Sequence, residues 1–221
     1  MEPQANPLSD ADLVRRILAG EHDLYEVIIR RYDRRLYRVV RSIVQDQNEA
    51  EDVVQDAYAR AFEHLAQFKG RSLFSTWLTK IAVHEAWNRM KQRSRHKGVD
   101  SILSRAPESG STPKTPEQQR LAEETRTILE DVIDHLPDAY RSVFVMRSLE
   151  GMSTLETAQC LDISEDAVKI RLLRARRMLR RALYEKVHAA SVNAFQFLGE
   201  RCDRITANVL RRIATLSPRS G

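Results

Sequence analysis

A run of basic residues in the second half of the chain carries the clearest signal for binding chemistry. Seven Lys or Arg residues and only two acidic residues lie between Ser164 and Arg181. Guanidinium and ammonium groups at this density bind phosphates, and arginine also reads the edge of guanine. At about 100° per helical residue, these cations share an outer surface with two apolar side chains that suit thymine methyl groups. The outward residues are Lys169, Ile170, Leu173, Arg174, Arg177, Arg180 and Arg181.

The residues around this run predict two short helices joined by a tight turn. Ser153 and Glu156 have the spacing of a capping box, and Ser164 can cap the second helix. The stripe opposite the cations is apolar: Val168, Leu172, Ala175, Leu179 and Ala182. Such a helix-turn-helix places its second helix in the major groove of DNA, whereas the alternative is a solvated basic helix. Asp162 occupies the turn position where glycine is common, although aspartate adopts the left-handed conformation less readily.

A second basic segment, from Lys69 to Asp100, contains both tryptophans, Trp77 and Trp87. It holds eight basic and two acidic residues. This mixture suits single-stranded nucleic acid, because bases stack on rings while cations hold phosphates. Packing in the core is the competing interpretation for Phe74 and Trp77, and His84 could equally be a plain surface residue.

The helix expected just before this segment has an acidic polar face. Its acids are Glu49, Glu51, Asp52, Asp56 and Glu63, with Gln55 among them. An acidic face repels DNA and suits a basic protein partner, unless it is only solvated.

The elements that position these surfaces are predicted to be helical, so the fold class is all-α. Apolar residues recur at helical spacing after Ser9, which caps a short helix ended by Gly20. Further helices are expected over about 24–44, 48–68 and 73–95, and again from Thr115 with Pro116 in its first turn. The Gly, Ser and Pro content of residues 98–114 predicts a flexible linker. The expected domains are therefore residues 8–97 and 115–183, joined by linker 98–114 and followed by an extension over 184–221.

Composition limits the function classes. The formal net charge of +5 is compatible with a polyanionic partner. Cys160 and Cys202 lie too far apart in sequence to form a metal-ligand pair, and this usage suits a reducing cytosol. A targeting segment and a membrane-spanning run are not recognised, so we expect a cytoplasmic protein without membrane insertion. A nucleophile–base pair, a phosphate-binding glycine loop and a metal cluster are not recognised either, so catalytic residues, a metal and a cofactor are not expected.

The extension after residue 183 has no clear role in the sequence. Its apolar residues from Phe195 to Ile213 fit another amphipathic helix, which Gly199 is expected to break or bend near its start. A docking or self-regulatory segment and a simple packing appendage both fit. Cys202 fits either a redox sensor or a small apolar residue.

The order of these segments resembles bacterial RNA polymerase sigma factors of the extracytoplasmic-function (ECF) group of the sigma-70 family. The resemblance covers about residues 8–183. Residues 50–90 resemble sigma region 2, and residues 136–179 resemble region 4. It implies a factor without enzyme activity that binds core RNA polymerase and directs promoter recognition and melting.

The resemblance also implies roles for individual residues. Asp52, Gln55 and Asp56 match the helix that docks on the polymerase. Residues matching the segment that holds the melted −10 non-template strand are Lys69, Phe74, Trp77, Lys80, His84 and Asn88; many relatives have Asn in place of His84. The residues that match the helix reading the duplex −35 element are Lys169, Ile170, Arg171, Leu173, Arg174 and Arg177.

The partners implied are core RNA polymerase, promoter DNA and an anti-sigma factor. Three other functions stay open: a helix-turn-helix regulator that never joins polymerase, a sigma-like decoy that binds an anti-sigma factor, and an RNA-binding module. The acidic face around Asp52 argues against the free regulator, and the basic helix after Ser164 argues against the decoy.

Overall fold

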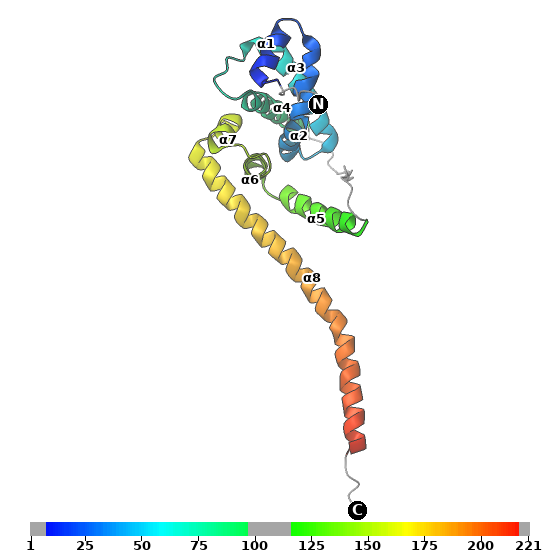
Figure 1. The fold of residues 1–221 in the computed structure, drawn as a ribbon. Helices are drawn as coiled ribbons and strands as arrows, with labels where there is room; N and C mark the ends of the chain where they lie inside the picture. Colours follow the sequence, from blue (N-terminus) through cyan, green and yellow to red (C-terminus); the bar gives the residue numbers. More distant parts are fainter. Residues whose placement is uncertain (1–7, 97–115, 217–221) are drawn as a thin grey trace, which may run out of the picture. The chain divides into compact units, whose positions relative to one another are not determined.

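The computed structural model describes residues 8–96 and 116–216, with side chains except at 96, 116–124, 189–202 and 213–216. All regular secondary structure in these residues is helical (Figure 1). The predicted linker at 98–114 lies outside the described residues. The chain forms two compact units, residues 1–176 and 177–221, and the last helix runs through their boundary. The all-α prediction is confirmed.

The first part of the chain folds into four α-helices with two short 3₁₀ turns. Ser9 caps the first helix by accepting from the N–H of Asp12, and Gly20 follows it with φ of 108°. The elements are α1 (Asp10–Leu18), η1 (His22–Leu24), α2 (Tyr25–Val44), α3 (Gln47–Glu63), η2 (Leu65–Gln67) and α4 (Phe74–His96). The prediction of a single helix over 48–68 was wrong at its C-terminal end. Helix α3 stops at Glu63, and the chain then turns to bury Leu65 in η2.

The second part of the chain continues with shorter helices and one long one. The elements are α5 (Pro116–Asp134), α6 (Asp138–Phe144), the π-helical turn η3 (Val145–Leu149), α7 (Thr154–Leu161) and α8 (Glu165–Leu216). The expected break at Gly199 was wrong, because α8 continues through it, whereas the alternative of a bend there stays a prediction. A glycine inside a helix costs only about 1 kcal/mol relative to alanine, which neighbouring helix formers can offset.

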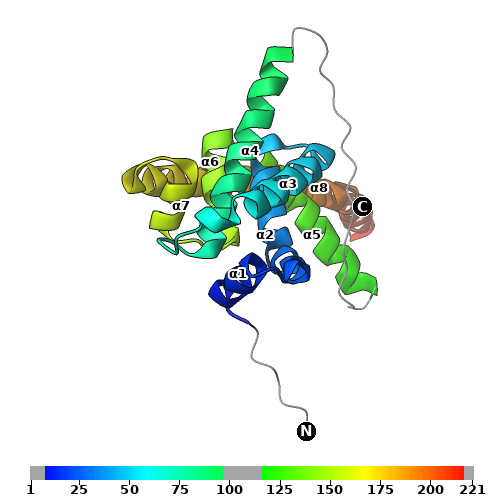
Figure 2. The same cartoon turned by 90° about the horizontal axis from the view of Figure 1, so that it is seen from above.

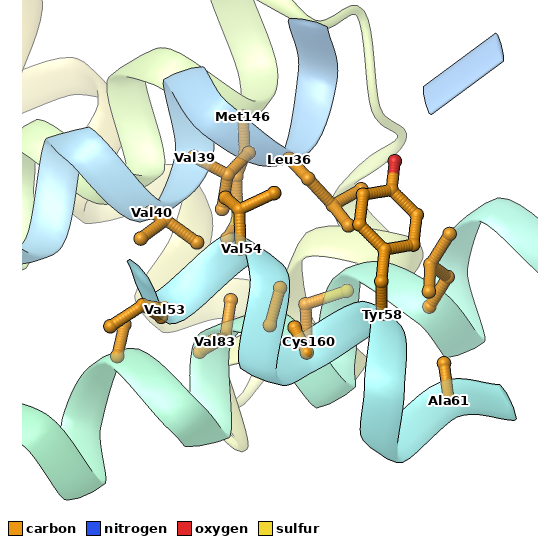
Figure 3. Packing of buried hydrophobic residues seen from close by; sticks show 14 of the residues in the cluster. Leu36, Val39, Val40, Val53, Val54, Tyr58, Ala61, Val83, Met146 and Cys160 are labelled. Atoms are coloured by element: carbon orange, nitrogen blue, oxygen red, sulfur yellow. The ribbon is translucent and has the colours of Figure 1, made fainter. Parts of the chain in front are cut away.

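One apolar core runs through the first unit. Figure 3 shows Met146 and Cys160 in the same cluster as Leu36, Val39 and Val83, and these five side chains are almost fully buried. Each of the buried Val, Leu and Met side chains contributes about 1.5–3 kcal/mol on burial. Helix α4 packs against α2 and α3 and also against α7, while α6 packs on α2 (Figure 2). The helices before and after the linker therefore share a core.

Candidate nucleic-acid interface

The turn between α7 and α8 has the predicted geometry. The N–H of Glu156 donates to Ser153 Oγ at 3.1 Å, and the N–H of Ser153 donates to Glu156 Oε2 at 2.6 Å, which completes the capping box. The N–H of Ala167 donates to Ser164 Oγ at 3.1 Å and caps α8. Asp162 ends α7 in the left-handed conformation, with φ of 50° and ψ of 47°. The predicted helix-turn-helix is confirmed.

The predicted DNA-reading face of α8 is open to solvent. Ile170 is 51% exposed and Leu173 is 71% exposed, although both are large apolar residues. Val168 and Ala175, on the opposite stripe, are fully buried. The burial pattern therefore fixes which side of the helix can meet a partner.

The exposed cations on this face have few protein partners. Lys169 donates to Asp166 at 3.0 Å, and this hydrogen bond raises the pKa of Lys169. Arg174 donates through Nη1 to the hydroxyl of Tyr140 at 3.4 Å. Arg177 is exposed. Because these guanidinium groups are solvated, their donors are available to an anion.

Arg171 does not share this face. Its side chain is half-buried and lines a pocket of about 240 Å³ together with Trp87 and Asp138. Of the predicted −35 residues, the structure brings Lys169, Ile170, Leu173 and Arg174 together and places Arg171 on another side of the helix.

The predicted −10 residues lie at different depths on and around α4. Lys69 and Asn88 are exposed, and Trp77 is half-buried. Phe74 is only 3% exposed, and its ring centroid lies 5.3 Å from that of Phe68 and 5.6 Å from that of Trp77. Phe74 therefore has the packing of a core residue that supports Trp77 from within.

Lys80 and His84, one turn apart on α4, both contact the helix-turn-helix. Lys80 Nζ lies 2.5 Å from Asp162 Oδ1, and His84 Nε2 lies 2.9 Å from Asp162 Oδ2. The hydrogen bond from Lys80 is the largest cause that lowers the pKa of Asp162, and His84 adds to it. Lys80 and His84, two of the predicted strand-binding residues, thus share the carboxylate of Asp162 as a partner.

The acidic face of α3 is exposed as predicted. Asp52, Gln55 and Asp56 are solvent-exposed, while Val53 and Ala57 face the core. The face is therefore accessible to a basic partner, although Asp56 already pairs with Arg89 of α4 at 3.2 Å.

Arginines to which the sequence assigned no role join distant parts of the first unit. Arg38 on α2 donates to Glu150 Oε1 at 3.1 Å, and Arg41 donates to Asp134 Oδ2 at 2.8 Å. Arg141 is 1% exposed and donates to the carbonyl of Ser42 at 2.6 Å. The spacing of Arg35, Arg38 and Arg41 along one face of α2 was the available signal, but it did not reveal their partners.

Cys160 is buried, and burial raises the pKa of its thiol to about 12. The Cys202 side chain lies outside those described, so its predicted alternatives are untested. Within residues 8–96 and 116–216, no helix is long and apolar enough to cross a bilayer.

Two family models match the chain. Sigma-70 region 2 matches residues 28–96, and Sigma-70 region 4 matches residues 126–179. The ECF RNA polymerase sigma-E factor of Escherichia coli strain K12 is 34% identical over 175 residues, covering 76% of this chain and 91% of that protein. The chain belongs to the ECF group of the sigma-70 family. It is a sigma factor of transcription initiation.

A second relative agrees with this assignment, and two solved structures share the fold. The sigma-E factor of Haemophilus influenzae is 30% identical to this sigma factor over 181 residues, covering 79% of this chain and 95% of its own length. The fold is shared with the sigma factor RpoE from Bartonella quintana, solved with the anti-sigma factor NepR, at a TM-score of 0.61 and 22% identity. That match covers 72% of this sigma factor and 96% of the other chain. CnrH, solved with the cytosolic domain of CnrY, has a TM-score of 0.54 and 24% identity, with coverage of 78% and 96%.

Proposed function

We propose that this sigma factor divides promoter recognition among three surfaces. The exposed face of α8 reads the duplex −35 element, the aromatic and basic surface of α4 holds the melted −10 non-template strand, and the acidic face of α3 docks on core polymerase. The observation that carries the proposal is the exposed α8 face, where Ile170 and Leu173 lie among solvated cations on a capped helix-turn-helix.

The −35 contact combines charge with shape. Lys169 and Arg174 bind phosphates or guanine edges, and Ile170 and Leu173 pack on thymine methyl groups. Each bidentate contact to a base contributes about 1–3 kcal/mol of discrimination. Arg171 is a less direct contact in this proposal, because its side chain is half-buried.

The −10 surface traps unpaired bases. Trp77 offers a ring for stacking, which contributes about 1–3 kcal/mol per base, and Lys69 and Lys80 hold the strand phosphates. His84 and Asn88 lie one turn apart on α4, where they can read a base edge. Phe74 contributes from the core, where its ring packs against Trp77 and holds it in place.

Asp52, Gln55 and Asp56 form the docking surface for a basic segment of core polymerase. The chain has no catalytic role in this proposal, because polymerase supplies the chemistry of RNA synthesis. The factor therefore acts in the bacterial cytoplasm, where polymerase and promoters are. An anti-sigma partner is proposed by analogy with RpoE from Bartonella quintana, which was solved in complex with the anti-sigma factor NepR.

The test is transcription in vitro with purified core polymerase on a fragmented genomic library, with and without the full chain. Discrete start sites that appear only with the chain are expected, and aligning them yields both promoter elements. A folded chain that binds library DNA but directs no new starts would instead support a helix-turn-helix regulator independent of polymerase. A folded chain that binds neither DNA nor core polymerase would instead support a sigma-like decoy that binds an anti-sigma factor.

A further inference from the structure

Arg174, on the proposed −35 face of α8, contacts a side chain from another helix. Its guanidinium Nη1 donates to the hydroxyl oxygen of Tyr140 on α6 at 3.4 Å. Lys169, by contrast, donates to Asp166, three residues earlier on α8 itself. A contact within one exposed helical turn moves with that turn, whereas a contact from a second helix restrains the side chain against the fold. Tyr140 therefore links the orientation of Arg174 to the position of α6.

The backbone that carries Tyr140 is firmly held. The next residue, Arg141, is 1% exposed and donates from Nε to the carbonyl of Ser42 on α2 at 2.6 Å. Its Nη1 donates to the carbonyls of Asp134 and Leu136 at 2.9 and 2.8 Å. These hydrogen bonds fix the start of α6 against α2 and the end of α5. The half-buried Tyr140 thus stands on a rigid support.

The first turn of α6 lies beside the edge of the proposed −35 face. Arg171 lines the same pocket as Asp138 and Ala139, and Arg174 reaches Tyr140, the next residue along α6. The two arginines are three residues apart and therefore neighbours on the surface of α8. Two independent contacts thus place the start of α6 along this side of α8.

The contact with Tyr140 leaves Arg174 able to bind DNA. A guanidinium group carries five N–H donors in one plane, and Tyr140 accepts from one of them. The other four are enough for a bidentate contact to O6 and N7 of guanine, and the side chain is exposed. Because the donors form a rigid fork, restraining one of them restricts the direction of the others. The Tyr140 hydroxyl can therefore orient the group without removing its ability to read a base.

We propose that Tyr140 is a positioning residue for −35 recognition, whose hydroxyl holds the Arg174 guanidinium in the orientation that a guanine edge requires. This inference rests on the proposed function of the α8 face. Ordering a rotamer-rich side chain at an interface costs binding free energy, so an arginine that is partly ordered beforehand binds more tightly. A bidentate base contact needs exact geometry, whereas attraction to a phosphate does not. Tyr140 therefore acts on sequence discrimination more than on overall affinity.

The test variant is Tyr140→Phe, which removes the hydroxyl and keeps the ring. The matched control is Tyr184→Phe, the same change at a tyrosine of α8 that is 68% exposed. Gel-shift titrations compare a duplex carrying the −35 element found by the transcription assay with a scrambled duplex. The ratio of the two affinities should fall about 2- to 10-fold in Tyr140→Phe and stay at the parent value in Tyr184→Phe. A parent ratio in Tyr140→Phe would overturn the proposal.

A double-mutant cycle separates positioning from a general effect on the fold. In the Arg174→Ala chain, adding Tyr140→Phe should leave the affinity ratio unchanged, because no guanidinium remains to be oriented. The salt dependence of binding should also match between Tyr140→Phe and the parent, since the number of phosphate contacts is the same. A further fall in the ratio, or a shallower salt dependence, would contradict a role through Arg174.

The order of the Arg174 side chain can be measured without DNA. Nuclear magnetic relaxation of arginine Nε–H groups reports their motion on the picosecond to nanosecond scale. The Arg174 signal is identified by its loss in Arg174→Lys. Tyr140→Phe should increase the motion of this group and leave that of Arg177, an exposed arginine of the same helix, unchanged. An unaltered Arg174 signal would overturn the positioning role.

Failure of this inference differs from failure of the proposed function. An Arg174→Ala chain that keeps the parent preference for the promoter duplex would overturn the −35 role of Arg174, whatever Tyr140 does. A reduced preference in Arg174→Ala together with the parent preference in Tyr140→Phe would overturn the positioning role and leave the −35 assignment standing.

Discussion

Asp56, on the proposed docking face of α3, lies 3.2 Å from the guanidinium group of Arg89 on α4. Asp52, on the same face, has no ion pair with any residue that the structure describes. A partner that binds this face must compete with Arg89 for Asp56, whereas Asp52 is available at once. The two carboxylates should therefore contribute unequally to docking.

The first prediction concerns this face. Asp52→Ala combined with Gln55→Ala should weaken binding to core polymerase by about tenfold or more, since charged contacts at an interface often contribute 1.5 kcal/mol or above. Fluorescence anisotropy of labelled chain with core polymerase measures the change. Thermal unfolding should be unaltered, because both side chains are exposed.

Two single variants refine this test. Asp56→Ala should reduce the affinity less than Asp52→Ala, because Asp56 already has an internal partner. Glu63→Ala, at the far end of α3, serves as the matched control. Wild-type affinity in the Asp52 and Gln55 double variant would remove the docking assignment.

The second prediction concerns the −35 contact. Arg174→Ala should weaken binding to a duplex containing the −35 element by about 1–3 kcal/mol, the range for a base contact by arginine. Gel-shift titrations on promoter and scrambled duplexes measure the effect. The loss should be larger on the promoter, since a phosphate contact alone would weaken both duplexes equally.

Arg181→Ala is the control for this measurement. Arg181 lies on the same helix and pairs with Glu185 at 2.9 Å. An unchanged preference for the promoter duplex in Arg174→Ala would refute the assigned role.

The third prediction separates two neighbouring aromatic residues. Phe74→Ala should lower the free energy of unfolding by about 3–5 kcal/mol, because it leaves a cavity between Phe68 and Trp77. Trp77→Leu should instead reduce promoter melting, since the half-buried ring is lost for stacking. Urea unfolding and permanganate reactivity of promoter thymines measure the two effects. A stable Phe74→Ala chain with defective melting would reverse the assignment.

The fourth prediction concerns pH. The Lys80 ammonium beside Asp162 holds the pKa of that carboxyl below its ordinary value of 3.8, with a further contribution from His84. The folded chain therefore binds this proton less tightly than the unfolded chain does. The contact contributes fully above pH 3.8 and is lost as the pH falls through the lowered pKa.

Carbon-detected nuclear magnetic resonance of the Asp162 carboxyl checks this direction. The midpoint should lie below 3.8 in the parent chain and return toward 3.8 in Lys80→Ala. Lys69→Ala, which removes an exposed cation elsewhere, should leave the midpoint where it was. A midpoint at the ordinary value in the parent would show that the contact is not made in solution.

Much of the site was readable in the sequence because its causes are local. The caps at Ser153 and Ser164 depend on side chains three residues from their donors, and the apolar stripe of α8 depends on helical spacing alone. The same spacing separated the acidic face of α3 from its buried face. Local backbone preferences and periodic burial are encoded over one or two helical turns, so a single sequence reveals them.

Tertiary structure decided the features that join residues far apart. Lys80 and Asp162 are 82 positions apart, and Arg38 and Glu150 are 112 apart, so no local pattern could pair them. It also placed Phe74 inside the core, turned Arg171 away from the reading face and ended α3 early to bury Leu65. The sequence by itself determined the helices and the charge of each face. Which faces meet depends on how the apolar stripes of separate helices share one core, and only the folded chain decides that.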